Sequence, residues 1–278
     1  MTSNDGAFSD TSGYTDILYE VDDDSSAAII TINRPERYNA FRGRTIDELV
    51  HAFRRAWADD TVRSIIWTGA GQKAFCAGGD VKQRAETGNY GPTRDGILDA
   101  DYLHSLLRDI PKPVIAAVNG AAIGGGHVFH VLCDISIASE TATFGQAGPR
   151  VGSFDAGYGT NFLARIVGQK RAREIWYFCR QYSADQALQW GLVNAVVAPD
   201  ELLDTARAWA KELKAMSPTA LKFLKFSFNA DTAHQGGLEK MANAGLDLFV
   251  QTQEAQEGAL AFAEKRKPDF GQYMSAGH

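Results

Sequence analysis

Short β-rich runs alternate with stretches of helical spacing along the chain. Residues 17–21 and 27–32 are two such runs on either side of an acidic cluster, 22–26, which predicts a hairpin with a polar loop. The Arg34-Pro35 step ends the second strand. Between residues 45 and 57 apolar side chains recur at helical spacing, with acidic side chains in the first turn, so we expect an amphipathic helix there.

The middle of the chain follows the order strand, loop, helix, strand. The runs 64–68 and 114–118 are short and apolar, as buried strands are, and the glycine-rich loop 120–126 opens into an apolar helix before a further strand at 135–138. This order indicates right-handed βαβ crossovers and a mainly parallel sheet. From residue 161 onward we expect helices, over 172–179, 184–190, 200–216, 219–228 and, as one or two long helices, 238–262.

The length of 278 residues, 45% of them hydrophobic, suits one or two domains and excludes disorder over the whole chain. We expect a flexible tail over residues 1–15, which are rich in Ser, Gly, Asp and Thr. An α/β core over 16–200 and a helical C-terminal subdomain over 201–278 follow from the order of elements.

Charge and cysteine usage narrow the partners and the compartment. With 34 acidic against 28 basic side chains the formal charge is −6, so we expect no nucleic-acid partner and no membrane partner. No apolar window is long enough to span a bilayer, and the polar amino terminus is unlike a signal peptide. Three widely spaced cysteines support neither a disulfide framework nor a CxxC metal site, so a soluble, cytoplasmic protein is expected.

Several common chemistries lack their motifs. The glycine-rich loops contain neither GxGxxG nor a P-loop, and GxSxG is absent, which argues against nucleotide-cofactor redox chemistry and a serine-hydrolase elbow. His127, His130 and Cys133 share a predicted helix and precede Asp134, which resembles a metal-ligand cluster. Since no zincin glutamate or remote third ligand accompanies them, we favour core packing and predict no metal.

Two glycine turns remain as candidate chemistry. The segment 76–80, Cys-Ala-Gly-Gly-Asp, follows one strand, and Gly124-Gly125-Gly126 follows another and opens a helix. Glycine lets the backbone approach a ligand closely, and free N–H groups at a helix start stabilise negative charge. Two such donors from different loops form an oxyanion hole, whereas either turn alone would be an ordinary tight turn.

Five motifs in order along residues 17–273 resemble the crotonase (enoyl-CoA hydratase/isomerase) superfamily. They are Asn33-Arg34-Pro35, the segments 74–80, 112–116 and 119–126, and Phe144-Gly145-Gln146. The resemblance implies an α/β fold with a crotonase-like β-β-α superhelix core and a C-terminal helical trimerisation subdomain. It also implies an acyl-CoA substrate, no tightly bound cofactor, and a homo-oligomer, either a trimer or a hexamer.

By the same resemblance, the N–H groups of Gly79 and Gly125 form the oxyanion hole. The superfamily's coenzyme A positions are occupied here by Arg37, Ala77, Lys82, Arg84 and Lys265. The alternative for the charged members is solvated surface, where isolated charges are most often found.

The two acid–base glutamates of the superfamily's hydratases are absent, because Val128 and Gly148 stand at their positions. Without them ordinary hydration loses acid–base catalysis, which contributes roughly 10²–10⁴-fold per group.

Segments 148–159, 173–177 and 266–270 resemble two relatives with carbon–carbon bond chemistry. One is 2-ketocyclohexanecarboxyl-CoA hydrolase, which opens a β-keto ring; the other is 1,4-dihydroxy-2-naphthoyl-CoA synthase, a ring-closing Claisen-type lyase. Ala147 departs from the threonine of the bicarbonate-dependent synthase, and Val250 from a tyrosine that both relatives carry.

Segments 41–43 and 227–235 favour the hydrolase, whereas Ser153-Phe154-Asp155 favours the synthase, and we prefer the hydrolase. Water activated near Asp155 and Ser153 would then attack the ring ketone, and Tyr90 in the glycine-flanked loop 88–91 would protonate the thioester enolate. The alternatives are a turn cap for Asp155 and an exposed loop aromatic for Tyr90. For the whole chain they are a hydratase-like protein without hydratase activity, or a non-catalytic scaffold.

Overall fold

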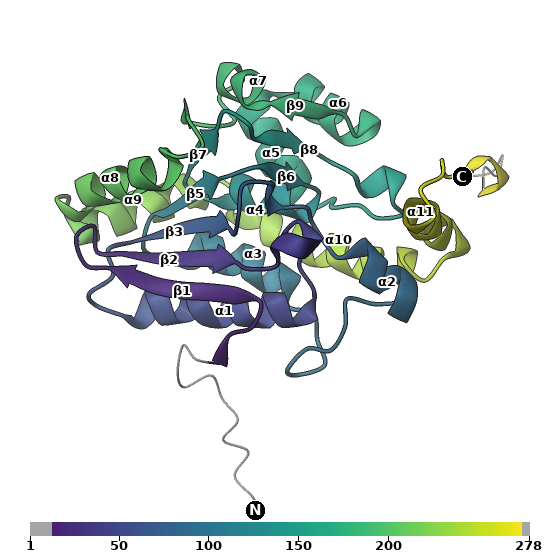
Figure 1. Ribbon diagram of the computed structural model, residues 1–278, viewed down its shortest axis with the longest axis horizontal. Helices are drawn as coiled ribbons and strands as arrows, with labels where there is room; N and C mark the ends of the chain where they lie inside the picture. Colours follow the sequence, from purple (N-terminus) through teal and green to yellow (C-terminus); the bar gives the residue numbers. More distant parts are fainter. Residues whose placement is uncertain (1–12, 274–278) are drawn as a thin grey trace, which may run out of the picture.

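The computed structural model describes residues 13–273, which form an α/β fold built on two sheets (Figure 1). The first sheet has six strands in the order β1-β2-β3-β5-β7-β10. Their bounds are β1 (Ile17–Asp22), β2 (Ala27–Ile32), β3 (Ser64–Gly69), β5 (Val114–Val118), β7 (Ile135–Ser139) and β10 (Ala195–Val197). β1 and β2 pair antiparallel and the other neighbours pair parallel, which confirms the predicted hairpin and the mainly parallel sheet.

The second sheet is absent from the sequence prediction. It contains, in spatial order, β4 (Ala74–Cys76), β6 (Ala121–Ile123), β8 (Thr143–Gly145) and β9 (Gln181–Ser183). β4 and β6 are parallel, with a bulge: Ala74 pairs with Ala121 and Cys76 with Ala122, so β4 carries one extra residue. Part of the segment 120–126, expected as a loop, is therefore a strand.

Helices cover both faces of the first sheet. They are α1 (Gly43–Ala58), α2 (Val81–Thr87), α3 (Ala100–Asp109), α4 (Gly125–Leu132), α5 (Tyr158–Val167), α6 (Gln169–Phe178), α7 (Ala184–Gln189), α8 (Leu202–Lys214), α9 (Pro218–Ala230), α10 (Gly236–Phe249) and α11 (Gln253–Ala263). Short 3₁₀ turns lie at η2 (Pro35–Arg37), η3 (Gly148–Arg150), η4 (Ala233–Gln235) and η5 (Gly271–Tyr273). The expected helices are confirmed as α1, α4 and α6 to α11, whereas α2, α3 and α5 are additional.

The sheet is apolar on both sides because both sides are covered. Along β2, Ala28, Ile30 and Ile32 belong to the core beneath α1, while Ala27 and Ile29 belong to the core beneath α8. α8, which the sequence assigns to the C-terminal subdomain, thus packs directly on the first sheet (Figure 1).

The described part of the expected tail contacts α1. The Thr15 N–H donates to Glu48 Oε1 at 3.0 Å, and Tyr14 Oη lies 2.5 Å from His51 Nδ1. These contacts correct the tail boundary at residue 15, because Tyr14 and Thr15 are already held by the core; residues 1–12 lie outside the described residues. Within residues 13–273, no helix combines the length and apolarity needed to cross a bilayer.

Candidate active site

The two glycine turns lie side by side because they continue neighbouring parallel strands. β4 leads into the first turn and β6 into the second. A Cβ atom placed on Gly78, whose φ is +89°, would lie 3.0 Å from the Ile123 carbonyl oxygen and 3.2 Å from the Gly125 nitrogen. The two backbones therefore touch, and only glycine fits at this contact.

The N–H groups of Gly79 and Gly125 are the candidate oxyanion donors. Phe41 N–H donates to the Gly78 carbonyl and Asp80 N–H to the Phe41 carbonyl, each at 2.8 Å, so this bridge passes over Gly79. Gly125 is the first residue of α4, where a helical N–H has no partner within the helix. Among residues 13–273 neither N–H donates a backbone hydrogen bond. Two unused donors, one at a helix start, are suited to a developing oxyanion.

Tyr90 covers the first turn. A Cβ atom on Gly79 would lie 2.5 Å from Cε1 and 2.8 Å from Oη of Tyr90. The Tyr90 ring also packs on Phe41, with centroids 5.8 Å apart, and its carbonyl accepts the Gly43 N–H at 2.7 Å. Tyr90 is half-buried, which favours the site role over the exposed loop aromatic.

Asp155 precedes α5 by three residues and lies beside Val128. Its Oδ1 accepts the N–H groups of Gly157 and Gly159, at 3.3 and 3.2 Å, so the turn-cap alternative is present in the structure. A Cβ atom on Gly159 would lie 2.8 Å from both Asp155 Cγ and Val128 Cγ2, so these two side chains are neighbours. The carboxylate of Asp155 thus stands close to a position that holds a glutamate in the hydratases.

Burial, the largest influence, raises the pKa of Asp155, while the charge of His104 lowers it and that of Glu239 raises it. Ser153, two residues earlier, is half-buried. Its N–H donates to the Gly148 carbonyl at 2.9 Å, and its hydroxyl makes no hydrogen bond within residues 13–273.

A buried histidine and glutamate next to Asp155 are absent from the sequence prediction. His104 Nδ1 of α3 lies 2.8 Å from Glu239 Oε1 of α10, and the Tyr158 N–H donates to Glu239 Oε2 at 2.6 Å. Asn243 donates to Glu239 Oε1 at 3.0 Å. The signal in the sequence is a polar residue on the apolar face of each helix: His104, for example, stands among the buried residues Leu103, Leu106 and Leu107.

The five coenzyme A candidates do not share one environment. Arg37, Lys82 and Lys265 are exposed, as a phosphate contact requires, and the half-buried Ala77 donates its N–H to the Tyr38 carbonyl at 3.1 Å. Arg84 is different.

Arg84 is 7% exposed and donates to the carbonyl of Val151 and, at 3.5 Å, to Tyr90 Oη. This corrects its assignment: its guanidinium holds α2 against the 148–153 turn and does not face solvent where a phosphate would lie.

His127, His130 and Cys133 have separate partners. His127 Nδ1 lies 3.3 Å from Gln146 Nε2, His130 Nδ1 lies 3.2 Å from Ser136 Oγ, and Cys133 Sγ lies 3.3 Å from the Phe129 carbonyl. Burial lowers the pKa of His127 to about 3, so this imidazole is neutral. In the described part of the chain no group of three or more such residues is arranged to hold a metal ion.

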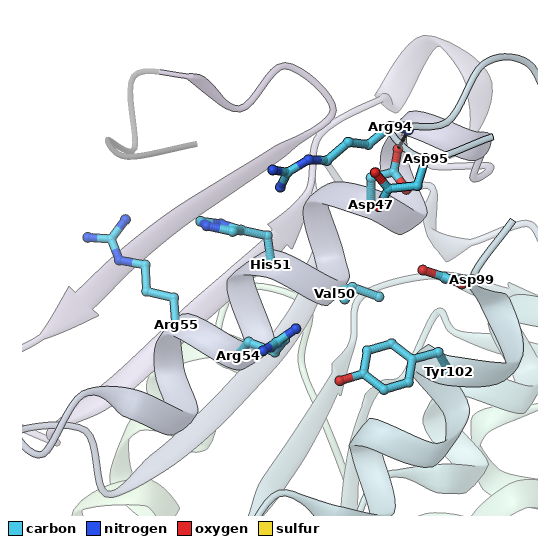
Figure 2. A pocket seen from close by; sticks show the side chains of 9 residues that line it. All are labelled: Asp47, Val50, His51, Arg54, Arg55, Arg94, Asp95, Asp99 and Tyr102. Atoms are coloured by element: carbon cyan, nitrogen blue, oxygen red, sulfur yellow. Dashed lines mark hydrogen bonds between the residues drawn. The ribbon is translucent and has the colours of Figure 1, made fainter. Parts of the chain in front are cut away.

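A surface hollow of about 600 Å³ lies between α1, the loop before α3 and the start of α3, away from the glycine turns. Figure 2 shows its lining, which mixes three arginines, one histidine and three aspartates with Val50 and Tyr102. Arg94 N–H donates to Asp47 Oδ2 here at 2.7 Å. None of the predicted site residues lines the hollow, so the candidate active site remains at the two turns.

Comparisons with known proteins identify the family of this chain. The family model described as enoyl-CoA hydratase/isomerase matches residues 22–273. An enoyl-CoA hydratase from Mycobacterium avium subsp. paratuberculosis is 27% identical with a TM-score of 0.81, and a carnitinyl-CoA hydratase from Mycobacterium avium is 30% identical with a TM-score of 0.80. An enoyl-CoA hydratase from Bacillus anthracis is 32% identical with a TM-score of 0.70. Each alignment covers 92% of this chain and 98% of the other.

Proposed function

The chain belongs to the enoyl-CoA hydratase/isomerase family as an acyl-CoA enzyme with a crotonase-like α/β fold, and from this premise we propose that it opens a cyclic β-ketoacyl-CoA by hydrolysis of a carbon–carbon bond. One observation carries the proposal: the Asp155 carboxyl group lies beside Val128, whereas Val128 and Gly148 leave both hydratase positions without an acid or base. An enzyme without those groups needs a different reaction of the same thioester enolate.

The first step is attack of water on the ring ketone. Asp155, with Ser153 as a hydrogen-bonding neighbour, takes a proton from the water as its oxygen bonds to the ketone carbon. The product is a tetrahedral hydrate anion, still joined to the α-carbon of the thioester.

Collapse of that anion breaks the bond between the former ketone carbon and the α-carbon. The former ketone becomes a carboxyl group, and the electron pair moves into the thioester as an enolate. The N–H groups of Gly79 and Gly125 stabilise the enolate oxygen, an interaction that strengthens as charge develops. A proton from Tyr90 to the α-carbon completes a dicarboxylic mono-CoA ester.

Coenzyme A is part of the substrate. Arg37, Lys82 and Lys265 supply positive charge for its phosphates, and the backbone at Ala77 lies next to the first glycine turn. Arg84 is not assigned to this role.

The ring-closing synthase reaction is the second candidate, favoured by the segment Ser153-Phe154-Asp155. It uses the same enolate in the opposite sense, as the nucleophile of a Claisen-type condensation. Ala147 weighs against the bicarbonate-dependent form, because the methyl group offers no hydroxyl donor to that anion.

Product masses separate these reactions. We would incubate the purified protein with 2-oxocyclohexane-carboxyl-CoA and, separately, with o-succinylbenzoyl-CoA. Ring opening adds one water to the first substrate, whereas ring closure removes one water from the second. Turnover of the second substrate alone favours the synthase, and no turnover of either contradicts both proposals.

A further inference from the structure

Two carboxylates accept N–H groups at the start of α5. Asp155 Oδ1 accepts the N–H groups of Gly157 and Gly159, and Glu239 Oε2 accepts the N–H of Tyr158, the first residue of the helix. A Cβ atom on Gly157 would come within 3.0 Å of the Glu239 backbone, so α10 lies directly against this turn. Two negative charges at one helix start repel each other and disfavour the charged form of both.

His104 is the basic side chain that contacts this pair, through Glu239. Its Nδ1 is fixed by Glu239 at 2.8 Å, and its ring contacts Phe129 edge-on, with centroids 5.7 Å apart. His104 Nε2 and Asp155 Oδ2 make no hydrogen bond within residues 13–273. Neither atom is among the side-chain nitrogen and oxygen atoms that are fully buried without a partner in that range. Each side chain therefore keeps one accessible polar atom, because Glu239 binds only His104 Nδ1 and the helix start binds only Asp155 Oδ1.

No other group described around His104 supplies a positive charge in its place. On α3, Asp101 adds negative charge. Arg108 of the same helix donates its N–H groups to Tyr158 Oη at 2.9 Å and to Thr232 Oγ1 at 2.8 Å. On α4, the buried His127 and His130 have lowered pKa values and are neutral. On α1, Asp47 and Arg54 line the hollow of Figure 2 together with Asp99 and Tyr102.

We propose that His104 is a positioning residue: oriented by Glu239, its imidazolium keeps the Asp155 carboxylate ionised at the start of α5. The pKa shifts point the same way. Burial alone would lower the pKa of His104, but the hydrogen bond to Glu239 and the charges of Asp155 and Glu239 raise it. In turn, the His104 charge opposes the effect of burial on the pKa of Asp155. The inference rests on the proposed function only where Asp155 serves as the base.

The direct test follows the Asp155 carboxyl by ¹³C NMR as the pH is varied, with the signal assigned from Asp155→Asn. In His104→Gln, which keeps a polar side chain without a charge, the Asp155 titration moves to higher pH. A shift of one pH unit corresponds to a tenfold change in the protonation equilibrium. An unchanged midpoint overturns the proposal, and this readout holds whichever reaction the enzyme performs.

Kinetics give a second readout. For 2-oxocyclohexane-carboxyl-CoA, the acid limb of kcat/KM moves to higher pH in His104→Gln, and activity recovers toward that of the wild type above the new limb. A uniform loss of kcat at every pH means a structural role and contradicts the proposal. His130→Gln is the matched control, because it replaces a buried, neutral histidine of α4 and leaves the Asp155 titration where it is.

If His104→Gln fails to fold, the titration of His104 in the wild-type protein and in Glu239→Gln tests the proposal instead. In the wild type, we expect the titration midpoint of the His104 imidazole to lie above the ordinary value near 6.5. In Glu239→Gln, we expect that midpoint to move to lower pH. A His104 that is neutral throughout the pH range of activity overturns the proposal.

Discussion

Asp155 caps α5 with one carboxylate oxygen and leaves the other accessible, so a single substitution can separate its two roles. Asn at this position keeps an oxygen that accepts the N–H groups of Gly157 and Gly159 but loses the base. We expect Asp155→Asn to lower kcat by roughly 10²-fold or more with little change in affinity for the CoA ester. Steady-state kinetics and a thermal melt on one preparation measure both. An active variant with a slightly lower melting temperature would remove Asp155 from the site.

The contact between Gly79 and Tyr90 gives a second prediction. In Gly79→Ala the new methyl group would overlap the Tyr90 ring, so the ring or the turn must move. We expect kcat to fall by roughly 10²-fold, the usual effect of misplacing an oxyanion donor. Gly237→Ala is the control: nothing lies within 4 Å of its Cβ, and alanine adds about 0.5–1 kcal/mol of helix stability. Equal activity in both variants would contradict this placement of the oxyanion hole.

Val128 gives a third prediction at the residue scale. Val128 is 1% exposed and lies where the hydratases carry one of their two acid–base glutamates. Gly148 stands at the position of the other glutamate. We therefore expect negligible hydration of crotonyl-CoA, measured as loss of the enoyl thioester absorbance. Turnover at the level of ordinary hydratases would show that another group supplies the acid and base.

At this scale the sequence locates the two glycine turns and Asp155, because each belongs to a local motif. His104 and Glu239 are 135 positions apart, and a single polar residue on an apolar helical face does not reveal its partner. Arg84 shows the reverse error, since a charged residue beside a turn is expected at the surface until its buried acceptor, the Val151 carbonyl, is known.

At the scale of elements, the His104–Glu239 pair joins α3 to α10 and makes their docking pH-dependent. Burial would raise the pKa of Glu239, but the hydrogen bond and charge of His104, together with the N–H donors of Tyr158 and Asn243, lower it. The contribution of Glu239 to stability is therefore present above about 4.5 and is lost as pH falls through the lowered value. The pKa of His104 is raised, so its contribution is present below about 6.5 and is lost as pH rises through the raised value.

We therefore expect Glu239→Gln to lose most stability between about pH 4.5 and 6.5, by about 3–5 kcal/mol, as when one partner of a buried pair is removed. Urea unfolding at a series of pH values measures this window. Glu86→Gln, at an exposed position of α2, is the control and should change stability little at any pH. A deficit that does not vary with pH would mean that the pair is not ionised.

Most of the elements that are absent from the sequence prediction are too short for a hydrophobic period to be recognised. β4, β6, β8 and β9 have three residues each, and α2 has seven, so none of them repeats a pattern. Their positions follow from tertiary pairing: β6 is a strand because it lies between β4 and β8.

For the whole molecule, the C-terminal helices leave large apolar side chains in water. Phe223 and Phe228 of α9 are 65% and 80% exposed, and Met241 and Leu248 of α10 are 66% and 71% exposed. Surfaces of this kind are usually covered by a partner, and we expect a trimer or a hexamer built of trimers. Light scattering at micromolar concentration measures the assembly, and a monomer would contradict it. Phe228→Glu should shift the assembly toward monomer, whereas Leu18→Glu in β1 should not.

The bulge in β4 has a consequence for how this site can change over generations. Because both proposed oxyanion donors, the N–H groups of Gly79 and Gly125, belong to the main chain, we expect most substitutions of acyl-pocket side chains to leave them in place. A deletion that removes the extra residue of β4 would draw Gly79 back along β6 by about 3.3 Å, more than a hydrogen bond tolerates. The acyl chemistry can therefore change by point mutation. Insertions and deletions in β4 or β6 are expected to be selected against, because they alter the register between the two strands.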